Sequence, residues 1–228
     1  MKNLVILGAG TAGTMMANHL VHKLPQSEWK ITIVDQYKTH YYQPGFLFLP
    51  FDIYTTDQVK KKGSKFIPKD VNYIQKKIEL IVPEENKVQL EKGEELPYDI
   101  LIIATGTKIA PEEVEGMKGP EWHKSIFDFY TYDGAKALRD KFREWEGGKL
   151  VVHITEMPIK CPVAPLEFAF WSDSYFKLKG IPDTVDINLV TPLSGALTKP
   201  IATQALTHSL TQKNIPSSTT LHIQREDY

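Results

Sequence analysis

The chain has one cysteine, Cys161, among its 228 residues. A single cysteine excludes an internal disulfide framework and is typical of proteins kept in a reducing compartment. Charges of the two signs nearly cancel, at 27 Lys and Arg against 28 Asp and Glu, so there is no strong net field and no nucleic-acid partner is expected. The seven histidines show no metal-ligand spacing, and we predict no metal site.

Long apolar runs are also missing. No run approaches the roughly 20 residues that a membrane-spanning helix needs, and the first residues lack the basic region, apolar core and cleavage site of a signal peptide. These absences predict a cytoplasmic protein and leave open peripheral attachment to the inner face of the cell membrane. The residues that are present, 42% apolar and 24% charged, are ordinary for a soluble globular chain of one large or two small domains.

Three glycines form one motif near the amino terminus, Gly8-Ala-Gly-Thr-Ala-Gly13. The motif lies between an apolar strand, Leu4–Leu7, and a helix with apolar residues at helical spacing. A second strand, Ile31–Val34, follows and ends in Asp35. This βαβ pattern is what binding of a dinucleotide requires, whereas a tight turn without a ligand is the alternative interpretation.

Each residue of this pattern has a separate physical role. Gly8 permits the tight turn, Gly10 lets backbone N–H groups approach a pyrophosphate, and Gly13 lets helix and strand pack closely. Asp35 can accept hydrogen bonds from ribose hydroxyls. Farther along, Tyr98–Ile103 predicts a buried parallel strand that ends in small residues, which again permit close approach to a ligand.

Three other stretches of this first half carry weaker signals. The aromatic segment His40–Pro50 is interpreted either as a wall beside a flat cofactor ring or as packing under a crossover. The basic run Lys60–Lys65 predicts a solvated loop, with attraction to anionic lipid as the alternative. Alternating residues from Val71 to Leu90, around a turn at Pro83–Asn86, predict a small antiparallel sheet.

The second half repeats a strand-turn-helix pattern at Lys149–Phe170, with Cys161 in the turn. A linker at Pro111–Pro120 and an amphipathic helix opening at Asp133-Gly134 precede it. Such a turn usually carries a glycine-rich phosphate loop, but this one has no glycine. Its helix, apolar on nearly every side, is expected to be largely buried and to end at Gly180.

A further strand, Val185–Val190, and an amphipathic helix, Ile201–Lys213, continue the alternation. The next strand should be apolar, but Pro216–Thr220 is polar, and only Leu221–Ile223 could form a short strand. We therefore expect the second βα unit to be left unfinished, with a sheet of one or two strands.

The glycine motif, Asp35 and the second βα unit together resemble the two-dinucleotide-fold flavoproteins. Within them, Cys161-Pro-Val-Ala-Pro-Leu-Glu167 and Thr191-Pro-Leu-Ser-Gly-Ala-Leu-Thr-Lys-Pro200 are similar to the sulfide:quinone oxidoreductase family. The resemblance spans residues 1 to about 214. It implies an α/β fold in which a Rossmann-like FAD-binding βαβ domain with a small antiparallel sheet is followed by an incomplete second Rossmann-like domain.

The resemblance also implies a domain division and a set of sites. Residues 1–110 would form the FAD-binding domain, 111–147 a linker and connecting helix, and 148–228 the incomplete second domain, without an NAD fingerprint. The implied catalytic residues are Cys161, as one member of a redox pair, and Glu167, for proton handling. The predicted FAD contacts are Gly8, Gly10, Thr11, Ala12, Gly13, Asp35, Gln36, Pro44, Ile78, Ala104, Thr105 and Gly106.

In that family a cysteine pair captures sulfide, and the electrons pass through FAD to a membrane quinone. The partner cysteine lies in the last third of a longer family chain, so the resemblance implies a truncated amino-terminal portion whose activity alone is left open. It also implies peripheral membrane association for the full-length protein, and leaves a homo-oligomer open.

Several alternatives stay open from the residues alone. Cys161 could be a buried spectator, and Glu167 could serve only to stabilise a helix terminus. The protein could be a flavocytochrome-type sulfide dehydrogenase or an NADH:quinone oxidoreductase, although side chains in place of glycine would occupy the space of an NADH pyrophosphate. From another class, it could be a catalytically inactive fragment that binds a nucleotide or a partner.

Overall fold

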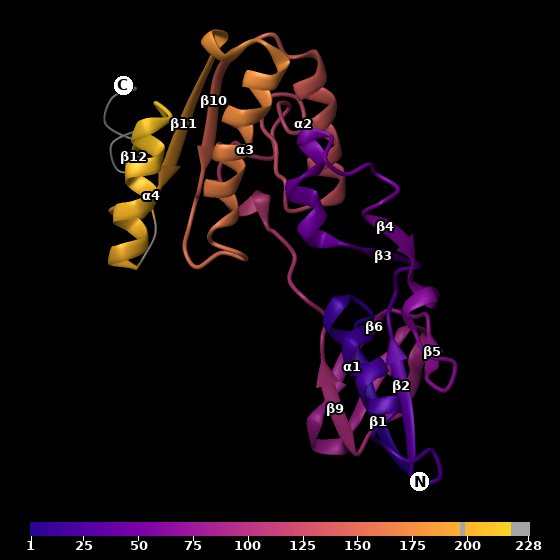
Figure 1. Cartoon of the computed structure of the whole chain (residues 1–228). Coiled ribbons are helices and arrows are strands. Elements are labelled where there is room, and N and C mark those ends of the chain that lie inside the picture. The colour runs from indigo at the N-terminus through magenta and orange to yellow at the C-terminus, as the bar shows by residue number, and fades with distance from the viewer. Residues whose placement is uncertain (197–198, 220–228) are drawn as a thin grey trace. The chain divides into compact units, whose positions relative to one another are not determined.

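The computed structural model describes residues 1–196 and 199–219, which divide by their internal contacts into two units. Unit 1 comprises Met1–Gly45 and Thr55–Ile109, and unit 2 comprises Phe46–Tyr54 and Ala110–Tyr228. Figure 1 traces both along the chain. The expected domain limits at residues 110 and 147 stay a prediction. No helix in the described ranges is both long and apolar enough to cross a membrane.

Unit 1 is built on a four-stranded parallel sheet in the order β5-β2-β1-β9 (Figure 1). Its strands are β1 (Lys2–Leu7), β2 (Trp29–Val34), β5 (Asn72–Ile74) and β9 (Ile100–Ile103). The helix α1 (Thr11–Val21) connects β1 to β2, which confirms the predicted βαβ unit. Counted along the chain, the spatial order is 3-2-1-4, which is the order of the first four strands of a Rossmann fold.

The strand β1 is apolar on both sides because both faces of the sheet are covered. Leu4 and Ile6 belong to the core that includes Ala17 of α1. Val5 and Leu7 point to the other core, which they share with an antiparallel sheet. The strands of that sheet are β6 (Ile78–Val82), β7 (Lys87–Leu90) and β8 (Glu94–Pro97). The predicted antiparallel hairpin around Pro83 is therefore confirmed.

Three predictions about unit 1 need correction. The stretch from Val71 also contains β5, which joins the parallel sheet rather than the antiparallel one. Lys60–Lys62 are not a loop, since they form β4 and pair with β3 (Thr39–Tyr41). The strand β9 is not fully buried: Ile103 is 63% exposed, because β9 is the edge of the sheet as far as the described residues go.

The described residues of unit 2 form a three-stranded parallel sheet in the order β10-β11-β12. Its strands are β10 (Gly148–His153), β11 (Val185–Thr191) and β12 (Ser217–Thr219), and its helices are α2 (Tyr132–Glu144), α3 (Ala164–Lys179) and α4 (Pro200–Gln212). The predicted helices and the first two strands are confirmed. Gly180 ends α3 in the left-handed conformation, with φ of 81°. One side of α3 is open, however, and Leu178 is 89% exposed.

The expectation of one or two strands is wrong, because the polar residues Ser217–Thr219 form a third parallel strand. The Leu189 N–H donates to the Pro216 carbonyl at 2.9 Å, and Ile215 is buried just before the strand. Backbone bonds to the neighbouring strand can hold a short edge strand whose own side chains are polar. The other candidate strand, Leu221–Ile223, lies outside the described residues.

The aromatic segment is shared between the two units. Its second part, Phe46–Pro50, belongs to unit 2, and both Leu47 in this part and Phe51 just after it are buried in the core of that unit. The Phe51 ring lies 5.2 Å from that of Phe168 on α3 and 6.0 Å from that of Phe142 on α2. Leu47 and the adjacent Phe51 therefore support packing for this end of the segment, the second of the two interpretations.

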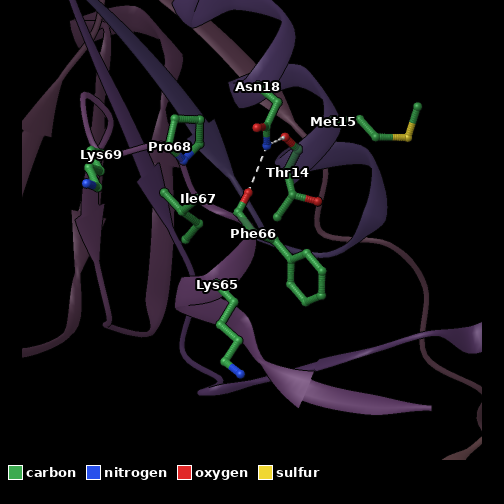
Figure 2. A pocket seen from close by; sticks show the side chains of 8 residues that line it. All are labelled: Thr14, Met15, Asn18, Lys65, Phe66, Ile67, Pro68 and Lys69. Atoms are coloured by element: carbon green, nitrogen blue, oxygen red, sulfur yellow. Dashed lines mark hydrogen bonds between the residues drawn. The ribbon is translucent and has the colours of Figure 1, made fainter. Parts of the chain in front are cut away.

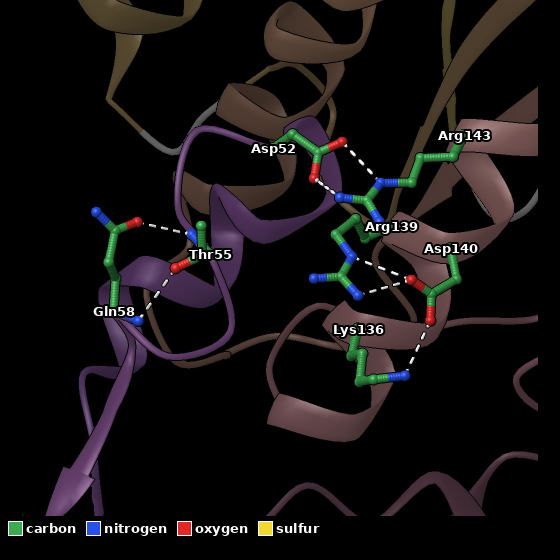
Figure 3. A network of polar contacts seen from close by, with 7 residues as sticks. All are labelled: Asp52, Thr55, Gln58, Lys136, Arg139, Asp140 and Arg143. Atoms are coloured by element: carbon green, nitrogen blue, oxygen red, sulfur yellow. Dashed lines mark hydrogen bonds and ion pairs between the residues drawn. The ribbon is translucent and has the colours of Figure 1, made fainter.

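Ion pairs and hydrogen bonds add polar contacts at the edge of this aromatic core, between the segment around Asp52 and α2. The Arg143 guanidinium donates twice to the Asp52 carboxylate, from Nε at 2.9 Å (Figure 3). Arg139 and Lys136 both hold Asp140 on the same helix (Figure 3). The two Arg143–Asp52 bonds connect residue 52 to α2 across 91 positions of sequence, so local spacing could not have predicted them.

Candidate cofactor and thiol sites

The glycine loop of unit 1 has two glycines that the fold itself requires. Gly8 has φ of +97°, and a Cβ there would lie 2.4 Å from the Ala104 carbonyl oxygen. A Cβ on Gly13 would lie 1.8 Å from the Gly8 carbonyl oxygen. The Ala104 N–H also donates to the Leu7 carbonyl at 2.7 Å, which brings the end of β9 against the loop. These contacts bring three predicted cofactor residues together.

Gly10 differs, because a Cβ there would meet no atom of the described chain within 4 Å. Gly10 caps α1 with an ordinary φ of −71°, and the first bond of the helix runs from the Thr14 N–H to its carbonyl at 3.0 Å. The N–H groups of Thr11, Ala12 and Gly13 therefore have no intrahelical acceptor. Free N–H groups at a positive helix end, beside open space, fit the pyrophosphate of a dinucleotide.

The carboxylate of Asp35 holds this loop from the end of β2. Its two oxygens accept from the Ala9 N–H and the Tyr37 N–H, each at 2.7 Å. A carboxylate has about four acceptor positions, so two remain for other donors. The expected bond from Asp35 to a ribose hydroxyl is therefore compatible with the remaining acceptor positions, and it stays a prediction.

The other predicted contacts lie on the same unit. Gln36 and Pro44 are exposed in the segment after β2, and Ile78 is partly buried at the start of β6. Thr105 and Gly106 are exposed beyond β9, where Gly106 has φ of +71°. Open space surrounds the position of a Gly106 Cβ within the described chain, as it does at Gly10.

Two side chains near the loop were missed by the sequence. The His40 Nδ1 lies 3.2 Å from the Ala9 carbonyl oxygen, and the His40 ring packs on that of Phe66 at 4.5 Å. The Tyr73 hydroxyl donates to the Tyr37 carbonyl at 3.1 Å, and burial, with a smaller effect of the Asp35 charge, raises the pKa of Tyr73. Neither residue is among the predicted FAD contacts: Tyr73 carries no motif, and His40 was noted only as part of the aromatic segment, because both contacts join residues that are distant in sequence.

A depression of about 510 Å³ beside α1 does not contain the predicted cofactor contacts (Figure 2). It is lined by Thr14, Met15, Asn18, Lys65, Phe66, Ile67, Pro68 and Lys69. The Asn18 amide donates to the carbonyls of Thr14 and Phe66, each at 2.8 Å, and closes one side (Figure 2). The hollow thus lies beside the body of α1, whereas the free N–H groups lie at its start.

The thiol of unit 2 lies in an unusual backbone. Cys161 is exposed and has φ of +52°, a conformation that residues other than glycine rarely adopt. Its carbonyl oxygen accepts from the Ala164 N–H at 2.9 Å and from the Tyr130 hydroxyl at 3.4 Å. Cys161 is therefore not the buried spectator that the sequence left open.

The start of α3 offers fewer N–H donors than the start of α1. The Ala164 N–H is already bonded to Cys161, and Pro165 has no N–H. Glu167 adds a negative charge to the first turn, where it is exposed. A second pyrophosphate would meet side chains and a carboxylate here, whereas at Gly10 it meets open space.

Within the described ranges, no group of three His, Cys, Asp or Glu side chains could hold a metal ion. The Glu167 side chain in the first turn of α3 is exposed. Its two interpretations, helix-terminus stabiliser and acid or base, both remain compatible with an exposed side chain.

Comparison with known proteins gives a family match over most of the chain. The model of the pyridine nucleotide-disulphide oxidoreductase family matches residues 2–153. A mitochondrial sulfide:quinone oxidoreductase of Dictyostelium discoideum is 28% identical over 186 residues, which are 81% of this chain and 41% of that protein. The predicted resemblance to sulfide:quinone oxidoreductases is thereby confirmed.

Two further similarities bear on the fold and on the alternatives. The crystal structure of sulfide:quinone oxidoreductase from Aquifex aeolicus superposes with a TM-score of 0.79 at 23% identity, over 96% of this chain and 51% of that one. This likeness confirms the α/β fold class. A type II NADH:quinone oxidoreductase of Staphylococcus aureus is 28% identical over 156 residues, 65% of this chain and 37% of that protein. The chain thus spans about half the length of its relatives, or less.

Proposed function

Because this chain belongs to the pyridine nucleotide-disulphide oxidoreductase family, we propose that it forms the FAD-binding and sulfide-capturing part of a sulfide:quinone oxidoreductase-type enzyme. One observation carries the proposal. The chain has two parallel strand-turn-helix units, and the first keeps free N–H groups beside open space while the second carries an exposed cysteine. One unit is therefore suited to a dinucleotide and the other to thiol chemistry.

In this proposal unit 1 binds FAD, and residues 1–110 act as its domain. The N-terminal N–H groups of α1 would hold the pyrophosphate, and Asp35 the adenosine ribose. Gln36, Pro44, Ile78 and the stretch Ala104–Gly106 would line the rest of the cofactor. Bound FAD supplies an acceptor for an electron pair, which a quinone at the membrane would finally receive.

Unit 2 supplies Cys161, which needs a partner thiol because the chain has no other cysteine. A hydrosulfide ion would attack the S–S bond between Cys161 and its partner cysteine. One S–S bond breaks and one forms, leaving a persulfide on one cysteine and a thiolate on the other, so atoms and charge balance. Glu167, exposed six residues beyond Cys161, is proposed to exchange the protons of these steps with solvent.

An NADH:quinone oxidoreductase is the alternative that one relative supports. The start of α3 argues against it, since Ala164 and Pro165 leave few N–H donors for an NADH pyrophosphate. An inactive nucleotide-binding fragment is the other alternative. It shares the FAD site of unit 1 and differs from the proposal only in the chemistry of Cys161.

The FAD site is tested by Gly10→Leu. We expect the fold of unit 1 to be unchanged, because the Gly10 Cβ direction is open, and FAD affinity to fall by about tenfold or more, because the side chain enters the pyrophosphate space. Fluorescence titration with FAD measures the affinity. Met15→Ala, an exposed change one turn along α1, is the control and should leave the affinity unchanged. Equal FAD affinity in wild type and Gly10→Leu would refute the site.

The thiol chemistry is tested with inorganic polysulfide and with NADH on the FAD-loaded chain. The Cys161 thiolate should take one sulfane sulfur from polysulfide, which is shortened by one atom, and mass spectrometry should detect the added sulfur. Cys161→Ser should lose this uptake completely.

NADH should not bleach the flavin absorbance. Rapid bleaching by NADH would favour the NADH:quinone alternative, and no sulfur on Cys161 would favour the inactive fragment.

A further inference from the structure

The segment before α2 is held rigidly by one carboxylate. Asp128 accepts from the Tyr130 N–H at 2.9 Å, from the Thr131 N–H at 2.6 Å and from the Thr131 hydroxyl at 3.0 Å. The Thr131 hydroxyl in turn accepts from the Gly134 N–H at 3.0 Å, which caps α2. A Cβ on Gly134 would lie 2.1 Å from the Asp128 carboxylate, so glycine is needed for this close approach.

The rigid segment also contacts the element that carries the thiol. The Phe129 ring stacks on that of Phe168 in α3, with centroids 4.5 Å apart and planes 1° from parallel. The next side chain, Tyr130, reaches the carbonyl of Cys161, 31 residues away in sequence. Two neighbouring aromatic side chains thus connect the start of α2 to the start of α3.

The left-handed backbone conformation of Cys161 needs stabilising contacts. Its positive φ is unfavourable for a residue with a side chain, because the Cβ comes close to the following carbonyl oxygen. Its carbonyl oxygen receives two donors, the Ala164 N–H and the Tyr130 hydroxyl, and rotation out of the left-handed region would move that oxygen away from both. The hydroxyl bond, at 3.4 Å, is long, so its contribution depends on the rigidity of Tyr130.

We propose that Tyr130 is a positioning residue for Cys161, whose hydroxyl holds the Cys161 carbonyl and thereby keeps the left-handed turn and the exposed thiol. The functional meaning of this inference rests on the proposed role of Cys161. The positioning itself concerns only the geometry of residues within unit 2. Burial, with a smaller effect of the Cys161 charge, raises the pKa of Tyr130 to about 12. The phenol is protonated at neutral pH, as an ordinary tyrosine would be, and the raised pKa extends its role as a donor to more alkaline pH.

The test uses the single cysteine of the chain, because alkylation by iodoacetamide then reports one thiol. In Tyr130→Phe the turn loses one donor, and we expect the alkylation rate across the pH profile to fall by about threefold. Tyr175→Phe is the matched control: Tyr175 is also partly buried in unit 2, and burial also raises its pKa, but it packs on Phe142 and Phe176. Its alkylation rate should equal that of the wild type.

A double-mutant cycle separates positioning from general destabilisation. Glycine adopts positive φ without strain, so in the Cys161→Gly background the loss of the Tyr130 hydroxyl should cost clearly less stability than in the wild type. Hydrogen exchange of the Ala164 amide, which donates to the same carbonyl, should accelerate in Tyr130→Phe while that of β10 does not. An unchanged alkylation profile, or additive effects in the cycle, would overturn the proposal. Sulfur uptake from polysulfide tests the proposed function separately, since it needs only a reactive Cys161.

Discussion

Gly13→Ala is expected to destabilise unit 1 by about 3 kcal/mol or more, although alanine normally favours a helix over glycine by about 1 kcal/mol. The new Cβ would lie 1.8 Å from the Gly8 carbonyl oxygen and 2.9 Å from its carbon. Both are backbone atoms, so no side chain can rotate away to relieve the overlap. The loop would have to separate from α1, and the bond from the Ala9 N–H to Asp35 would be disturbed with it.

Hydrogen exchange measured by mass spectrometry tests this effect unit by unit, which suits a chain whose two units need not unfold together. Protection should fall in β1, β2 and β9 and stay unchanged in β10 and β11. Gly10→Ala serves as the internal control, because its Cβ meets open space and its φ is ordinary, and protection should be preserved. Wild-type protection in Gly13→Ala would show that the loop does not have the close approach described here.

Phe142→Ala is expected to cost unit 2 about 3–5 kcal/mol. Phe142 on α2 is 2% exposed and lies at the centre of an aromatic cluster. Its ring centroid lies between 5.0 and 6.1 Å from those of Phe51, Trp145, Phe168, Tyr175 and Phe176. Removing it leaves a cavity that the other rings cannot fill without leaving their own contacts, and each lost aromatic pair adds a smaller loss.

The reciprocal pattern of hydrogen exchange should appear in Phe142→Ala. Protection should fall in β10, β11 and α3, while β1 and β2 keep wild-type values. Phe142→Leu, which retains most of the volume, should lose less than half as much stability. If α3 stayed protected in Phe142→Ala, the cluster would not be the core of unit 2. The two variants are also controls for each other, since each should affect one unit alone.

The proposed function assigns cofactor binding to unit 1 and thiol chemistry to unit 2. In unit 1 the fold requires Gly8 and Gly13, and open space leaves Gly10 to a ligand. In unit 2 the corresponding turn has lost its glycines and exposes Cys161 instead. In the proposed function, the same strand-turn-helix geometry would therefore support an anion site in one case and a reactive thiol in the other, according to which side chains and N–H groups the turn contains.

Much of unit 1 and of its candidate site followed from the sequence, because the signals are local. Backbone sterics within the glycine loop, the apolar run of β1 and the acid at the end of β2 act over a few residues, so their spacing predicts the βαβ unit. The turn at Cys161 was found for the same reason. The relation between Cys161 and Tyr130 was not found, because neither residue type nor spacing indicates a contact over 31 positions.

What the sequence determined by itself is the alternation of strands and helices, the glycine loop and the place of the lone thiol at the start of α3. Only the tertiary structure decided that Phe51 packs in unit 2, that polar Ser217–Thr219 pair with β11 as a further strand, and that the Tyr130 hydroxyl donates to the Cys161 carbonyl. The reason is physical. Local backbone preferences depend on neighbouring residues, whereas an edge strand or a long-range hydrogen bond depends on which surfaces the folded chain brings together.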